Sequence, residues 1–112
     1  MQKEAIEQEA IVKYCEWKHY IMFAVPNGGK RNAKEAHFMK LSGVKAGVPD
    51  MMFPKARHGY HGLFIELKVG RNKPTPAQER WLHELNKAGY LARVCWGREQ
   101  AIELIDWYFG GE

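Results

Sequence analysis

Three residues in the middle of the chain, Asp50, Glu66 and Lys68, have types and a spacing that suit metal-assisted hydrolysis. Fifteen residues separate Asp50 from Glu66, and a hairpin over that stretch would place the two carboxylates side by side. Glu66 and Lys68 are two residues apart on a predicted strand, so their side chains point to the same side of the sheet. Neighbouring carboxylates repel each other and need a cation between them. The spacing therefore predicts a metal site.

Oxygen ligands decide which metal such a site would hold. The carboxylates of Asp50 and Glu66, with the backbone carbonyl of Leu67, form a hard oxygen set that suits Mg²⁺ or Mn²⁺. Lys68 would then orient an attacking water or neutralise charge that develops on a phosphate. The alternative is an exposed Glu66–Lys68 pair on an edge strand, with Asp50 capping a turn.

The hydrophobic pattern predicts four strands among four helices. Helices are expected over residues 3–19 and 32–41, after the N-cap residue Thr75, and from Gly97 onward. Strands are expected over 20–25, 50–53, 62–69 and 90–96, and the second and third should pair as a hairpin. A strand, a helix and a strand near the end of the chain predict one parallel crossover on a mixed sheet.

The helix after Thr75 has the clearest start signal in the chain. Thr75 is expected to be the N-cap residue, Pro76 stands at the first helical position, and Gln78 occupies the capping-box position. Gln78 can also be interpreted as a residue near the metal site, and it can have both this role and the capping role. The class is therefore α/β or α+β, in one domain over residues 1–112 with a single core. Trp17, Trp81 and Trp107 are expected to lie mostly in that core.

The charge is concentrated in one part of the chain. The 112 residues carry a net charge of +4, but residues 30–73 hold ten bases and three acids, whereas the rest holds seven bases and ten acids. A basic zone on a small domain favours a polyanionic partner such as a nucleic-acid backbone, although a solvated lysine-rich surface is the alternative. Asp50 and Glu66 are two of the three acids in this zone, which again favours a bridging cation.

The remaining composition excludes several classes. No apolar run approaches the roughly 20 residues of a membrane helix, and the N-terminus is too acidic for a signal peptide. The two cysteines, Cys15 and Cys95, exclude a disulfide framework and are expected to be buried. No eight-residue phosphate-loop motif is present, so no nucleotide cofactor is expected. We expect a cytoplasmic protein, in a bacterial or phage-infected cell, that does not bind membranes.

Three segments together resemble a known family. Residues 43–50 (GVKAGVPD), 64–68 (FIELK) and 75–78 (TPAQ) are similar to the small stand-alone form of the VRR-NUC (virus-type replication-repair nuclease) family. This family belongs to the PD-(D/E)XK nuclease superfamily. The resemblance implies an αβββαβ core, Mg²⁺- or Mn²⁺-dependent phosphodiester hydrolysis, Asp50 and Glu66 as metal ligands, and Lys68 as the catalytic lysine. It also implies a role for Gln78 near the metal.

The resemblance further implies one more acid from the first helix. Glu4 shares a helix face with Gln8 and Ile11, and we favour it over Glu7 and Glu9. The alternative for all three acids is favourable charge near the helix N-terminus.

DNA is the implied substrate, and a branched form such as a four-way (Holliday) junction or a flap is expected, in replication, recombination or repair. The candidate DNA contacts are six polar or basic residues: Asn27, Lys30, Arg31, Lys45, Arg71 and Lys73. The glycine-rich turn at 27–29 could cradle a phosphate with backbone N–H groups. A homodimer would place two sites for paired cuts. The alternatives are a binding module that has lost catalysis, a flap nuclease and a sequence-specific nuclease.

Overall fold

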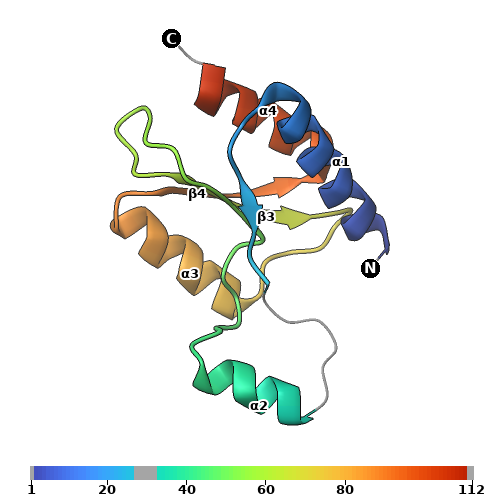
Figure 1. Ribbon diagram of the computed structural model, residues 1–112, viewed down its shortest axis with the longest axis vertical. Coiled ribbons are helices and arrows are strands. Elements are labelled where there is room, and N and C mark those ends of the chain that lie inside the picture. The colour runs from blue at the N-terminus through green and yellow to red at the C-terminus, as the bar shows by residue number, and fades with distance from the viewer. Residues whose placement is uncertain (1, 27–32, 111–112) are drawn as a thin grey trace.

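A four-stranded mixed sheet between helices forms the body of the protein (Figure 1). The structure is a computed structural model that describes residues 2–26 and 33–110. Its elements, in chain order, are α1 (Gln2–Lys18), β1 (Phe23–Ala24), α2 (Ala33–Leu41), β2 (Met51–Phe53), β3 (Leu63–Lys68), α3 (Pro76–Lys87), β4 (Leu91–Trp96) and α4 (Gly97–Gly110).

The sheet has the predicted hairpin and the predicted crossover. Its order is β1-β2-β3-β4, with antiparallel pairing of β1 with β2 and of β2 with β3. β3 and β4 run parallel and are joined by α3. The predicted α+β class and mixed sheet are confirmed. The first strand is much shorter than the predicted 20–25, because only Phe23 and Ala24 pair with β2.

The core lies on the face of the sheet that α1 and α4 cover. Leu63, Ile65 and Leu67 alternate along β3 and are fully buried, together with Ile105 and Tyr108 of α4. Figure 1 shows α1 and α4 side by side on this face and α3 on the opposite face. The sheet is therefore covered on both sides. Because the apolar core fills one face of the inner strand β3, a buried polar residue on β3 must point to the other face, which α3 covers.

Two features shape the start of α3 and the segment that packs against it. The capping box at Thr75 and Gln78 starts α3 as predicted. Gly47 has a positive φ of 95°, and a Cβ atom there would come within 2.8 Å of the Ala77 carbonyl carbon. The segment before β2 can therefore lie against the first turn of α3 only because residue 47 is glycine.

The cysteines are buried as the sequence predicts, but two of the tryptophans are not. Cys15 and Cys95 are buried, as expected. The expectation for the tryptophans is wrong, because Trp17 is 72% exposed and Trp107 is 49% exposed. No helix in the described part of the chain is both long and apolar enough to cross a bilayer.

Candidate metal centre and catalytic site

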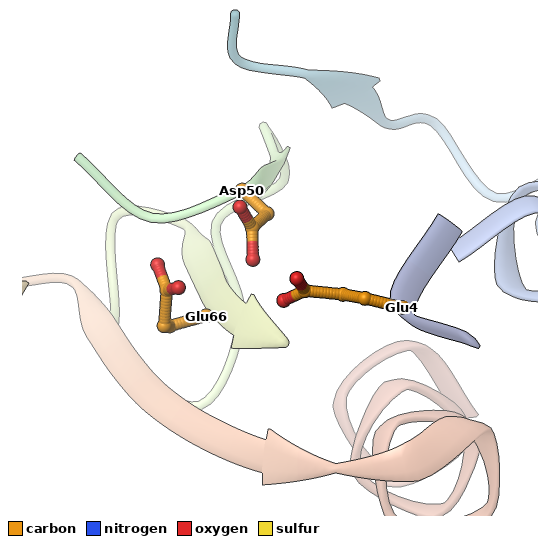
Figure 2. Close-up of side chains that lie close together, drawn as sticks. All are labelled: Glu4, Asp50 and Glu66. Carbon is orange, nitrogen blue, oxygen red and sulfur yellow. The ribbon is translucent and has the colours of Figure 1, made fainter. Parts of the chain in front are cut away.

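The β2–β3 hairpin brings Asp50 and Glu66 together. Met51 pairs with Ile65, so the next residues outward, Asp50 and Glu66, lie opposite each other. Directly opposed residues of an antiparallel pair have their side chains on the same face of the sheet. Figure 2 shows both carboxylates directed into one space, with Glu4 reaching in from α1.

Glu4 completes a cluster of three carboxylates. One oxygen from each of Glu4, Asp50 and Glu66 can be chosen so that all three atoms lie within 4.8 Å of one another. The two other candidate acids of the first helix, Glu7 and Glu9, lie elsewhere. Glu7 pairs with Arg98 at 3.0 Å, and Glu9 pairs with Lys13 at 3.4 Å. The tertiary structure thus places Glu4 beside the hairpin carboxylates.

Glu66 is the buried member of the cluster. Its side chain is 1% exposed, and within the described residues its Oε1 atom has no hydrogen-bond partner. Burial, together with the negative charge of Asp50, raises the pKa of Glu66 to about 8, although Lys68 acts in the opposite direction. The pKa of Glu4 is also raised, by partial burial and then by Asp50. An acid kept this far from water without a full set of partners needs a ligand to compensate it.

Two further contacts define the geometry of the cluster. Lys68 follows Glu66 on the same face, and its Nζ atom lies 3.5 Å from Glu66 Oε2. The Lys68 side chain is only 12% exposed. The backbone N–H of Leu67 donates to Asp50 Oδ2 at 2.7 Å, which fixes the Asp50 carboxylate against β3. Among the described residues, Lys68 thus offsets only part of the negative charge of the three carboxylates.

A divalent cation fits this arrangement. The donors are hard carboxylate oxygens from α1, from the residue before β2 and from β3, and one buried oxygen, Glu66 Oε1, has no hydrogen-bond partner among the described residues. Mg²⁺ and Mn²⁺ prefer such oxygen ligands and keep water or phosphate oxygens in their remaining positions. The partly exposed side chains of Glu4 and Asp50 leave access from solvent. The site can thus accept both an ion and the phosphate of a substrate.

Gln78 has a structural role in the start of α3. Its Oε1 accepts from the backbone N–H of Thr75 at 2.9 Å, and its own N–H donates to Thr75 Oγ1 at 3.2 Å. Of its two interpretations, the capping box is the one with observed contacts.

The predicted DNA-contact residues fall into two groups. Lys45, Arg71 and Lys73 are exposed, in the loops that precede β2 and follow β3. The first loop ends at Asp50, directly before β2, and the second begins directly after β3, the strand that carries Glu66. Asn27, Lys30 and Arg31 lie outside the described residues.

The Glu7–Arg98 contact was not anticipated from the sequence. Glu7 accepts from the backbone N–H of Arg98 at 2.7 Å and pairs with its guanidinium, so it ties the first half of α1 to the start of α4. This contact positions the turn of α1 that carries Glu4. No sequence signal could have found it, because 91 residues separate the partners and neither stands in a motif.

Comparisons with known proteins identify a family and a similar solved structure. A family model described as the VRR-NUC domain matches residues 2–99. A solved structure titled "VRR_NUC domain protein" is similar to this chain with a TM-score of 0.81 and 33% sequence identity. The alignment covers 95% of this chain and 87% of that one. No curated protein matches the chain.

Proposed function

Because the chain belongs to the VRR-NUC domain family, we propose that it is a metal-dependent DNA endonuclease that hydrolyses phosphodiester bonds. The observation that carries the proposal is the buried Glu66 carboxylate, which lies beside Asp50, Glu4 and Lys68 and has one oxygen with no partner in the part of the chain that the structure describes. A purely structural role does not account for it, because burying a second acid next to Asp50 destabilises the fold.

Each residue of the cluster has a distinct part in the proposed reaction. Glu4, Asp50, Glu66 and the Leu67 carbonyl would hold Mg²⁺ or Mn²⁺, and the bound ion would polarise the scissile phosphate and acidify a water. Lys68 places a positive charge beside that water, orients it and offsets the negative charge that develops on the phosphate. The hydrogen bond from Leu67 N–H keeps Asp50 in position. Gln78 supports the site through α3.

The proposed substrate is branched DNA, such as a four-way junction or a flap, in replication, recombination or repair. The exposed bases Lys45, Arg71 and Lys73 beside the hairpin supply contacts to phosphates on either side of the cut. Asn27, Lys30 and Arg31 are proposed to extend this surface. A homodimer would present two sites and make paired cuts in a two-fold junction.

The test is cleavage of a labelled panel: four-way junction, flap, splayed arm, plain duplex and single strand. Each is incubated with Mg²⁺, with Mn²⁺ and with EDTA. Lys68→Ala is the test variant and Lys87→Ala, an exposed lysine of α3, is the matched control. We expect metal-dependent cleavage that Lys68→Ala abolishes and Lys87→Ala leaves intact, with DNA binding retained by both.

Four results would contradict parts of the proposal. Undiminished turnover by Lys68→Ala would overturn the catalytic lysine. Binding without cleavage of any substrate would favour a binding module that has lost catalysis. Cleavage of plain duplexes at one sequence would favour a sequence-specific nuclease. Light scattering at micromolar concentration tests the homodimer, and a monomer there argues against paired cutting.

A further inference from the structure

An open pocket of about 540 Å³ adjoins the acidic cluster. The first two turns of α1, the residues just after β3 and the junction of β4 with α4 enclose it. Lys3 and Gly70 line it; Lys3 directly precedes Glu4 in α1, and Gly70 lies two residues after Lys68. Its volume is within the roughly 300–1,000 Å³ of small-molecule sites. A group bound in this pocket would lie next to a substrate phosphate bound at the proposed metal site.

Trp96 is the aromatic wall of this pocket. It pairs with Lys68 in the parallel register of β3 and β4, so the two residues are side by side on neighbouring strands. The indole N–H donates to the carbonyl of Asn72 at 2.7 Å, and the backbone N–H donates to Gln100 Oε1 at 2.9 Å. The ring is thus anchored through its edge, yet the residue remains 38% exposed. A large aromatic side chain that is held rigidly and left open is a ready stacking surface.

The other lining residues match the remaining parts of a nucleotide. Ile6 is 54% exposed and adds an apolar wall. Lys3 supplies a positive charge for a phosphate. The Glu7 carboxylate, held in place by Arg98, can accept hydrogen bonds from the N–H groups of a base. A nucleotide has a flat ring, polar ring edges and an attached phosphate, which suit Ile6, Glu7 and Lys3 in turn. A base inside a continuous base-paired stack has no free ring face to offer.

We propose that this pocket binds one unpaired nucleobase next to the scissile phosphate, with Trp96 as its stacking partner. The inference rests on the proposed nuclease function, and it adds a reason for selecting flaps and splayed arms among branched DNAs. A flap, a splayed arm or a frayed end presents an unpaired base beside a cut site, whereas the bases of an intact four-way junction are all paired. An intact duplex must first unstack a base, which makes the net free energy of binding less favourable.

The experiment moves a single abasic residue, one position at a time, through the unpaired strand and across the branch point of a splayed-arm DNA. Binding is measured by fluorescence anisotropy in EDTA at one fixed salt concentration. The proteins are wild type, Trp96→Ala, Trp96→Phe, and Trp17→Ala as a control in which an exposed tryptophan at the other end of α1 is removed. Cleavage of the intact DNA is measured in parallel.

We expect wild type to lose about tenfold in affinity when the abasic residue occupies one particular position, because stacking on an aromatic ring contributes strongly for each base. Trp96→Ala should bind the intact DNA about tenfold more weakly and should not respond to the abasic residue. Trp96→Phe should keep part of the response, and Trp17→Ala should match wild type. Circular dichroism and the thermal midpoint verify that the variants fold.

Several outcomes would overturn the inference. An abasic profile of Trp96→Ala that follows that of wild type would show that Trp96 does not contact the base. A flat wild-type profile together with normal cleavage would overturn the pocket and leave the nuclease proposal standing. Wild type that neither binds nor cuts any of the DNAs would overturn both.

Discussion

Replacing Glu66 by glutamine should stabilise the metal-free protein, although it removes a proposed metal ligand. Glu66 is buried, and its pKa is raised from 4.5 to about 8. An acid with a raised pKa in the folded state binds its proton more tightly there than in the unfolded chain. The burial of Glu66 therefore does not destabilise the folded protein below pH 4.5. The free energy of unfolding falls as the pH rises from 4.5 to about 8.

The magnitude follows from the same pKa values. Each pKa unit corresponds to about 1.4 kcal/mol, so the penalty reaches about 3 kcal/mol at pH 7 and about 5 kcal/mol above pH 8. Glutamine has the shape of the protonated acid and does not ionise. Glu66→Gln should therefore match wild type near pH 4.5 and exceed its free energy of unfolding by up to about 3 kcal/mol at pH 7.

Urea unfolding in EDTA at pH 4.5, 7 and 9 measures this difference. The control is Glu103→Gln, which removes the same charge from an exposed position on α4 and should show no comparable trend. Adding Mn²⁺ should raise the stability of wild type, since a ligand that binds only the folded state stabilises it, and should leave Glu66→Gln unchanged. A stability difference that stays constant with pH would refute the reasoning, as would a Glu66→Gln variant that is less stable than wild type at pH 9.

Three other substitutions test the parts that surround Glu66. Asp50→Asn should weaken Mn²⁺ binding at least tenfold in calorimetry, because it removes a charged ligand, and unchanged affinity would exclude Asp50 from the site. Thr75→Ala should lower the free energy of unfolding by about 1 kcal/mol, since it breaks the capping box with Gln78, whereas a neutral result would show that the cap contributes nothing. Gly47→Ala should lower the free energy of unfolding more than Thr75→Ala, because the new Cβ meets the backbone of Ala77 and residue 47 has a positive φ. Thermal unfolding measures this difference, and equal midpoints for the two variants would contradict the close approach.

Local signals were enough to place most elements and two of the three carboxylates. The capping box at Thr75 needs only residues three apart, and the alternation of Leu63, Ile65 and Leu67 identifies the core face of β3. The same alternation puts Glu66 on the other face. The family and the fold class, predicted from these segments, are confirmed by the family match and by the similar solved structure. The roles of the site residues and the DNA surface stay predictions.

Long-range contacts were beyond what these patterns could decide. The helix face favours Glu4 over Glu7 and Glu9, but the contact itself depends on how α1 packs. That packing brings Glu4 to the hairpin and Glu7 to Arg98, whereas Glu9 pairs with Lys13 within the helix.

The first strand and the tryptophans illustrate the same limit. The apolar stretch at 20–25 suits a full strand, but β2 offers partners only to Phe23 and Ala24. Trp17 is apolar and beside a helical stripe, yet it lies at the end of α1 beyond the reach of the core. The sequence by itself determined which residues could form helices, strands and a carboxylate pair, because those preferences act between near neighbours. Which acid joins that pair, and which aromatic rings stay open to solvent, depended on where whole elements come to rest against one another.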